Sequence, residues 1–320
     1  MNIIFMGTPE FAVPSLQELL HHGYEVKAVV SQPDRPKGRK RVLSPTPVKE
    51  EALKYGIPVL QPEKLRTTEA VESILALEPD LIITAAYGQI VPKAILARPQ
   101  YGCINVHGSL LPKYRGGAPI QHAIMNGEDK TGVTIMYMAE GLDTGDMISS
   151  VEVGIASDDH SGSMFAKLSE AGAQLLISTL PQIISGEAKA IPQDSEQATY
   201  APNLKREDEQ IRWNQPAEQI FNLVRALYPQ PCAYTTLADQ IVKIHRCALV
   251  QRNGNEAAQH DQAQAALPGT VLHASEDGIE VQTGGGVLRI AEIQPAGKKP
   301  MSVSQFLRGN PLQSGVRLGG

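Results

Sequence analysis

Residues 80–86 read Asp80-Leu-Ile-Ile-Thr-Ala-Ala86, an almost uninterrupted apolar run. A run of this kind is typical of a strand in a parallel sheet that helices cover on both faces. Outward from this strand, short apolar runs alternate with helical patterns through the first half of the chain. The alternation predicts βαβ units and therefore an α/β domain built on a doubly wound, mostly parallel sheet.

The other elements follow from apolar periodicity and from Gly and Pro between the periodic segments. In the first half, strands are expected over 3–6, 25–30, 58–60, 80–86, 103–106, 131–138 and 147–153, and helices over 9–22, 47–55, 67–77 and 161–184. Residues 187–205 show no period and predict a linker. Beyond it, a helix over 215–226, short strands between 233 and 294 and a helix over 301–307 indicate a small β barrel. We therefore expect a catalytic domain over 1–189, a linker over 190–205 and a C-terminal domain over 206–320.

Composition limits the class of protein. The chain has 320 residues, of which 42% are hydrophobic and 20% charged, with a net charge of −5. These values fit a soluble globular protein and argue against one that binds nucleic acid over its whole surface. No apolar run approaches the roughly 20 residues that span a bilayer, and the N-terminus lacks the features of a signal peptide. We expect a cytoplasmic protein with no membrane partner.

The segment after the central strand carries the strongest chemical signal. Residues 103–119 read Cys-Ile-Asn-Val-His-Gly-Ser-Leu-Leu-Pro-Lys-Tyr-Arg-Gly-Gly-Ala-Pro. Asn105 and His107 are two residues apart, so their side chains leave the same face of an extended backbone. An amide donor beside an imidazole can hold a developing oxyanion and move a proton. The alternative is a polar pair that only satisfies backbone groups, but the unusual Ser-Leu-Leu-Pro that follows favours the catalytic interpretation.

An acidic partner for this imidazole is expected in the segment Gly141-Leu-Asp-Thr-Gly145, between two predicted strands. A cationic imidazole is stabilised by a nearby carboxylate. Asp143 is the first choice, ahead of Asp146. The alternative is that Asp143 is an ordinary turn aspartate.

A basic run covers residues 35–41, Arg-Pro-Lys-Gly-Arg-Lys-Arg. Its cations are Arg35, Lys37, Arg39, Lys40 and Arg41. Such runs are often solvated, flexible loops. This loop follows the second predicted strand, at the same sheet edge as Asn105 and His107, on an otherwise acidic protein. Its position favours the binding of a polyanion such as nucleic acid.

A further candidate ligand segment is Tyr87-Gly88-Gln89-Ile90-Val91-Pro92, which follows the central strand. Gly88 would let a ligand approach the backbone, while Tyr87 and Ile90 would line a flat apolar pocket. The alternative is a plain strand-to-helix turn. NAD is not expected, because Gly7-Thr-Pro-Glu-Phe11 lacks the glycine pattern of a dinucleotide site. Zinc is not expected either, since no Cys or His spacing fits.

Taken together, these segments resemble the 10-formyltetrahydrofolate-dependent formyltransferase family, and within it the methionyl-tRNA formyltransferases. The resemblance runs nearly end to end. It rests on Phe5-Met-Gly-Thr-Pro-Glu-Phe11, Asp34-Arg-Pro-Lys-Gly-Arg39, the motif over 105–120 and Gly141-Leu-Asp-Thr-Gly-Asp-Met147. The motif over 105–120 is specific to formyltransferases as a group. The basic loop and the C-terminal β domain select the members that act on tRNA.

The resemblance implies a Rossmann-like formyltransferase domain followed by an OB-like, tRNA-binding barrel. The implied reaction moves a formyl group from 10-formyltetrahydrofolate to the α-amino group of methionyl initiator tRNA, for translation initiation. Asn105, His107 and Asp143 would be catalytic, and the basic loop would enter the acceptor stem. The implied folate-binding stretch is Ser109, Leu110, Leu111 and Pro112. No metal is expected to take part, and the protein is expected to be a monomer.

Two other interpretations fit part of the chain. Purine-pathway formyltransferases and sugar-nucleotide formyltransferases share the central motif, but the former leave residues 206–320 unexplained and the latter usually carry a second fused enzyme. An RNA-binding protein with an inert α/β domain is the other. Residues 206–320 carry 11 basic and 11 acidic residues, so this region has no net positive charge that would attract RNA. This balance argues against the RNA-binding interpretation.

Overall fold

The computed structural model describes residues 1–38, 42–250 and 266–319. Within them the chain forms two compact units. The first unit consists of residues 1–120, 130–155 and 164–203, and the second of residues 121–129, 156–163 and 204–320. The predicted boundaries of the catalytic domain, linker and C-terminal domain stay predictions.

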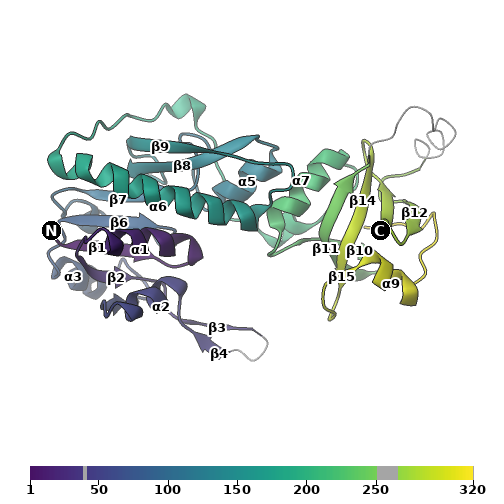
Figure 1. Ribbon diagram of the computed structural model, residues 1–320, viewed down its shortest axis with the longest axis horizontal. Helices are drawn as coiled ribbons and strands as arrows, with labels where there is room; N and C mark the ends of the chain where they lie inside the picture. Colours follow the sequence, from purple (N-terminus) through teal and green to yellow (C-terminus); the bar gives the residue numbers. More distant parts are fainter. Residues whose placement is uncertain (39–41, 251–265, 320) are drawn as a thin grey trace. The chain divides into compact units, whose positions relative to one another are not determined.

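The first unit is built on a seven-stranded sheet with the order β5-β2-β1-β6-β7-β8-β9 (Figure 1). Its strands are β1 (Ile3–Gly7), β2 (Val26–Val30), β5 (Val59–Leu60), β6 (Leu81–Ala85), β7 (Cys103–His107), β8 (Lys130–Tyr137) and β9 (Met147–Gly154). The strands from β5 to β7 pair in parallel, whereas β8 and β9 are antiparallel additions. This topology confirms the predicted doubly wound, mostly parallel α/β fold.

Helices cover both faces of this sheet, as its uniformly buried central strands require. They are α1 (Val13–His21), α2 (Pro47–Lys54), α3 (Thr68–Leu75), α4 (Lys93–Leu96) and α6 (Ser161–Ser185), with 3-10 turns at Glu10–Ala12 and Ser195–Gln197. A further helix, α5 (Pro119–Met125), begins in the first unit and continues into the second. Thr46 and Thr67 cap α2 and α3 by accepting hydrogen bonds from backbone N–H groups. The short helices α4 and α5 were absent from the sequence prediction. Helix α4 has only four residues, and the buried residues of α5, Ile120, Ala123 and Ile124, span little more than one turn.

The alternation of side chains along β7 decides which residues reach the active face. One face of the sheet packs Ile4, Ile82 and Cys103 against α3 and α4. Val106, on the opposite face, lies beside Gly172 of α6, where an added Cβ would come within 3.0 Å of the valine Cγ1. Asn105 therefore shares the face of Cys103, and so does His107.

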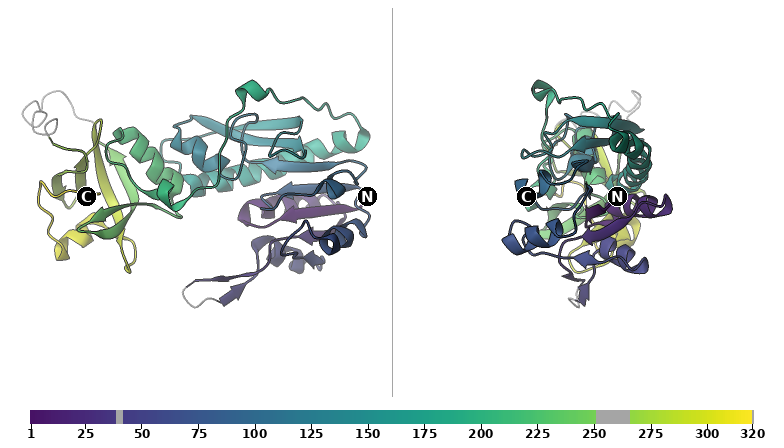
Figure 2. Two further views of the ribbon diagram at one scale, coloured as in Figure 1. Left: turned by 180° about the vertical axis from the view of Figure 1, so that it is seen from behind. Right: turned by 90° about the vertical axis from the view of Figure 1, so that its left-hand side faces the viewer.

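The basic run is partly a β hairpin and only partly a loop. Strands β3 (Arg35–Lys37) and β4 (Val42–Ser44) pair antiparallel and project from the sheet, as Figures 1 and 2 show. The loop prediction was wrong for residues 35–37, because Val42 and Leu43 supply a short extended partner strand. Arg39, Lys40 and Arg41 lie outside the described residues.

The second unit contains an antiparallel sheet with the order β10-β11-β14-β13-β12, to which β15 adds beside β14. Its strands are β10 (Ala233–Leu237), β11 (Gln240–Leu249), β12 (Val271–Ser275), β13 (Gly278–Gln282), β14 (Val287–Pro295) and β15 (Met301–Ser302). Among the described residues of the 204–320 segment, the helical elements are a 3-10 turn at Arg206–Glu209, α7 (Ala217–Leu227) and α9 (Val303–Gly309).

The core of this second unit forms where α7 packs on the sheet. Ile220, Val224 and Leu227 recur at helical spacing and join Ile244 and Ile290 in one buried cluster. The final helix begins at Val303, two residues later than expected, because Met301–Ser302 pairs with β14. Along the described parts of the chain, no helix combines the length and apolar character needed to cross a membrane.

Candidate active site

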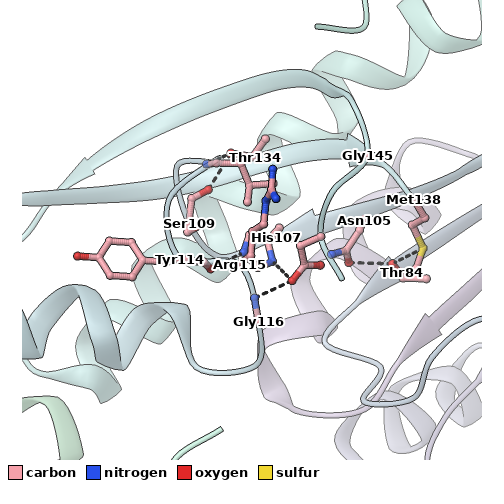
Figure 3. A network of polar contacts seen from close by, with 12 residues as sticks. Thr84, Asn105, His107, Ser109, Tyr114, Arg115, Gly116, Thr134, Met138 and Gly145 are labelled. Atoms are coloured by element: carbon pink, nitrogen blue, oxygen red, sulfur yellow. Dashed lines mark hydrogen bonds and ion pairs between the residues drawn. The ribbon is translucent and has the colours of Figure 1, made fainter. Parts of the chain in front are cut away.

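Asn105 and His107 lie side by side at the carboxyl end of β7 (Figure 3). This is the edge of an α/β sheet at which ligands bind in doubly wound folds. His107 is opposite Thr134 on β8, and Asn105 is opposite Thr84 on β6. His107 is only 5% exposed, so its ring is almost fully enclosed by protein.

Both nitrogens of the His107 ring face polar groups of the protein. Nε2 lies 3.0 Å from the carbonyl oxygen of Tyr114. A carbonyl only accepts hydrogen bonds, so Nε2 carries a hydrogen and donates it. Nδ1 is consequently the nitrogen that faces the carboxylate of Asp143, at 3.7 Å from Oδ2. Protonation of the ring would place a second hydrogen on Nδ1, toward Asp143.

Asp143 reaches this position from the loop between β8 and β9. Its Oδ2 accepts a hydrogen bond of 2.8 Å from the Gly116 amide. Its backbone has a φ of +50°, an uncommon left-handed conformation for a non-glycine residue. Gly145 closes the same turn so tightly that a Cβ there would lie 1.9 Å from the Tyr137 carbonyl oxygen. A strained turn that aims a carboxylate at an imidazole is a feature typical of functional sites.

The amide of Asn105 is oriented by Thr84. The Thr84 hydroxyl lies 2.8 Å from Asn105 Oδ1, 3.2 Å from the Ile104 carbonyl oxygen and 3.3 Å from Met138 Sδ. Donation to Oδ1 fixes which end of the amide is the acceptor. Nδ2 has no hydrogen-bond partner among the residues that the structure describes, so its N–H groups are available to a ligand. The site thus offers an oriented amide donor beside an imidazole–carboxylate pair.

The stretch expected to bind folate forms a tight turn after β7. Ser109 is fully buried, and its hydroxyl donates to the Lys113 carbonyl oxygen over 2.7 Å. Leu111 is 7% exposed, and its amide donates to the Thr134 hydroxyl. Leu110 packs beside Gly132, and Pro112 is half-buried. The turn is therefore held by the Ser109–Lys113 bond and by contacts to β8, and its half-buried side chains are Leu110 and Pro112.

The second expected ligand segment divides between core and surface. The Tyr87 side chain belongs to the core cluster beneath β6, and burial raises the pKa of its hydroxyl to about 12. Its carbonyl oxygen accepts hydrogen bonds from the side chains of Thr8 and Gln32. Gly88 is exposed with a φ of +88°, and Ile90 is 83% exposed. The exposed groups of this segment are therefore those of Gly88 and Ile90, whereas the Tyr87 ring faces the interior.

The base of the basic hairpin is anchored by a polar cluster. Lys49 Nζ lies 2.6 Å from Asp34 Oδ2 and 2.7 Å from Gln61 Oε1. Gln61 Nε2 donates to Asp34 Oδ1 at 2.6 Å. The Gln61 bond and then the Lys49 bond hold the pKa of the Asp34 carboxyl below its ordinary value. Arg35, at the start of β3, forms an exposed ion pair with Glu63, and Lys37 lies at the end of β3.

Three groups that contact the catalytic candidates had no assigned role in the sequence prediction. They are the Thr84 hydroxyl, the Tyr114 carbonyl and the Gly116 amide. A threonine at the end of an apolar strand was the one available signal, whereas backbone groups leave no trace in residue type. Searched over its described residues, the chain has no cluster of three or more His, Cys, Asp or Glu side chains that could hold a metal ion.

Comparison with known proteins agrees with this architecture. Residues 1–180 match the Formyl transferase family, and residues 203–311 match the Formyl transferase C-terminal domain. The chain is 54% identical over 319 residues to the methionyl-tRNA formyltransferase of Bacillus subtilis, covering 99% of this chain and 98% of that protein. It is 56% identical over 321 residues to the protein of the same name from Geobacillus thermodenitrificans, again covering 99% and 98%.

Solved structures with low sequence identity share the fold. The methionyl-tRNA formyltransferase from Clostridium thermocellum superposes with a TM-score of 0.53 at 20% identity, covering 80% of this chain and 95% of that one. HypX from Aquifex aeolicus gives a TM-score of 0.65 at 18% identity, covering 96% of this chain. The chain spans about half of the HypX chain, 48% of its length.

Both domain matches and the full-length identity to curated relatives lead to one conclusion. The chain belongs to the formyl transferase family and, within it, to the methionyl-tRNA formyltransferases.

Proposed function

We propose that this enzyme transfers the formyl group of 10-formyltetrahydrofolate to the α-amino group of methionyl initiator tRNA. The product would be N-formylmethionyl-tRNA. Relatives at 54–56% identity over nearly the whole chain carry the name of this activity. The observation that carries the proposal is the meeting of Asn105, His107 and Asp143 at the carboxyl end of β7.

The first step forms a bond between the methionyl nitrogen and the formyl carbon. The amine must be neutral to attack, and negative charge then develops on the formyl oxygen. Asn105 Nδ2 would donate to that oxygen, with Thr84 holding the amide in the donating orientation. A donor that is already oriented costs no reorganisation when charge develops, which is why such donors have large effects on rate.

The imidazole supplies the second donor. Because Nε2 already donates to Tyr114, the second hydrogen of the charged ring, on Nδ1, is the one that can be offered to the substrate oxygen. The distance of 3.7 Å from Nδ1 to Asp143 is longer than a hydrogen bond, so a substrate oxygen can compete for that proton. Asp143 would stabilise the ring in its charged form while the oxyanion exists.

The second step breaks the bond from the formyl carbon to the folate nitrogen. The attacking amine loses one proton, and the departing folate nitrogen gains one, so the reaction is balanced without an external acid. Asp143 is the carboxylate available to accept the amine proton, directly or through water. The folate is used as a substrate, and its pterin and linker would lie along the turn over 109–112 and the exposed Gly88–Ile90 edge.

The tRNA would be bound through the basic hairpin. Arg35, Lys37, Arg39, Lys40 and Arg41 give residues 35–41 a strong positive charge on a chain with a net charge of −5. The cluster of Asp34, Lys49 and Gln61 holds the base of the hairpin to the sheet. We assign the hairpin to the acceptor arm, because that part of the tRNA must reach the carboxyl edge of β7.

The test is an acceptor panel with the full-length enzyme and 10-formyltetrahydrofolate. The acceptors are methionylated initiator tRNA, methionylated elongator tRNA, an amino-sugar nucleotide and a purine-pathway amine. We expect rapid formylation of the initiator tRNA and slow or absent formylation of the other three. Preferred use of the sugar nucleotide or the purine precursor would overturn the proposal, and so would equal use of the two tRNAs.

A further inference from the structure

Gln193 ties the turn that carries Asp143 to a buried arginine. Its Nε2 donates to the carbonyl oxygens of Asp143 and Gly145, at 2.8 and 2.7 Å. Its Oε1 accepts from Nε and Nη2 of Arg115, at 3.0 and 2.8 Å. The primary amide therefore has four close contacts, and a single side chain spans the turn and the arginine.

Arg115 is a rigid anchor for this link. It is 3% exposed, and the ion pairs of the described residues include no carboxylate within 4.0 Å of its guanidinium. A buried charge needs hydrogen bonds in place of water, and the Gln193 oxygen supplies two of them. Arg115 in turn orients Gln193, because donation to Oε1 leaves the amide nitrogen of Gln193 directed toward the turn that carries Asp143.

The residues on either side of Arg115 hold the catalytic pair itself. The Tyr114 carbonyl accepts from His107 Nε2, and the Gly116 amide donates to Asp143 Oδ2 (Figure 3). Residues 114–116 thus touch the imidazole, the carboxylate and, through Gln193, the backbone behind the carboxylate. Residues 114–116 therefore fix the positions of both the imidazole and the carboxylate of the His107–Asp143 pair.

The segment that contains Gln193 also holds residues 114–116 in place. Thr199 accepts from the Tyr114 amide through its hydroxyl and from the Arg115 amide through its carbonyl. Ala201 donates its amide to the Arg115 carbonyl oxygen, and Ile191 exchanges two backbone hydrogen bonds with Met147. Residues 191–201 are therefore bound along the site at both ends.

We propose that Gln193 is a positioning residue that keeps the Asp143 carboxylate aimed at His107 by tethering its turn to Arg115. The proposal rests on the proposed function, because it assigns Asp143 to the formyl-transfer step. It assigns Gln193 no contact with the substrates. A positioning residue of this kind affects the chemical step more than substrate binding, since a displacement of about 1 Å in a catalytic group can cost on the order of a hundredfold in rate.

The test compares Gln193→Ala and Gln193→Glu with the parent enzyme, with Gln197→Ala as the matched control. Gln197 is an exposed glutamine of the same segment that bonds only to Asp194 among the described contacts. We expect Gln193→Ala to lower kcat at least about tenfold, while KM for folate and for tRNA changes less than about threefold. Gln197→Ala should leave all three constants unchanged.

Gln193→Glu keeps the contacts to Arg115 and removes the hydrogen bonds to the Asp143 and Gly145 carbonyl oxygens. The carboxylate still accepts from Arg115, so the variant should remain folded, with a thermal unfolding midpoint above that of Gln193→Ala. Its oxygens would face the carbonyl oxygens of Asp143 and Gly145, so kcat should fall as in Gln193→Ala. A kcat equal to that of the parent in a folded Gln193→Glu variant would overturn the proposal. This variant gives a result even where Gln193→Ala fails to fold.

A double-mutant cycle with Asp143→Ala distinguishes positioning from general support of the fold. If Gln193 acts through Asp143, Gln193→Ala should cost less than about twofold once Asp143 is already alanine. An equal loss in both backgrounds would overturn the positioning role. Loss of activity in Asp143→Ala with no effect of Gln193→Ala would also overturn it. Full activity in Asp143→Ala would instead refute the proposed catalytic site, so the two failures are distinguishable.

Discussion

Replacement of Thr84 by valine tests how the Asn105 donor is oriented. Thr84 is 3% exposed, and valine matches its shape while removing the hydroxyl. The hydrogen bond of 2.8 Å to Asn105 Oδ1 is then lost. The Asn105 amide remains in place, but nothing among its described contacts keeps Nδ2 turned toward the substrate oxygen.

The size of the effect follows from that one hydrogen bond. A protein hydrogen bond contributes a net stabilisation of about 0.5–1.5 kcal/mol. If this energy holds the amide in its productive orientation, its loss raises the barrier equally and lowers kcat by about two- to thirteenfold. Removal of the amide itself should cost more, because the loss of one oxyanion donor typically lowers kcat by about 10²–10³.

The assay is steady-state formylation with Thr84→Val, Asn105→Ala and the double variant. Thr131→Val is the control, since Thr131 is a buried threonine of β8 outside the network. We expect Thr84→Val to lower kcat in the parent background and to have no further effect in the Asn105→Ala background. Equal losses in both backgrounds would show that Thr84 does not act through Asn105, and so would a Thr84→Val loss larger than that of Asn105→Ala.

Three further predictions concern the reaction centre, the tRNA contact and the hairpin base. Asn105→Ala and His107→Ala should each lower kcat at least about a hundredfold with the fold intact, and near-normal rates in both would remove the site assignment. Neutral substitutions at 39–41 should raise KM for tRNA and reduce the slope of log(kcat/KM) against log salt, whereas an unchanged slope would show that these cations contact no phosphate. Asp34→Asn should lower the thermal midpoint at pH 7. Because the folded-state pKa of Asp34 is lowered, its stabilisation is present above the ordinary value of 3.8 and is lost as the pH falls through the folded-state pKa, so the two midpoints should converge at low pH. A constant difference from pH 7 to pH 2 would contradict this assignment.

The α/β sheet could be predicted because its signal is local. Apolar runs such as residues 81–85 and the Gly and Pro residues between them depend only on neighbours in the chain. The period of two in a strand also placed Asn105 and His107 on one face without any tertiary information. That Asp143 would approach His107 was predicted from the chemical need of an imidazole for a carboxylate, and the structure brings the two within 3.7 Å.

Contacts between distant residues gave no comparable signal. Gln193 meets Asp143 from 50 positions away, in a segment whose lack of periodicity predicts only a linker. The β3–β4 hairpin was missed because its strands are three residues each and one contains a proline. In this hairpin Val42 and Leu43 pair with Lys37 and Pro36, which belong to a run of mostly charged residues that gives no strand signal.

The most direct test of the proposed active site is the single-turnover rate of formyl transfer to methionyl initiator tRNA, with enzyme in excess over tRNA. This measurement isolates the chemical step from product release, so it reports on the groups at the carboxyl end of β7. We expect Asp143→Asn and His107→Ala each to slow this step at least about a hundredfold, while tRNA still binds with parental affinity. Parental single-turnover rates in either variant would contradict the proposed site.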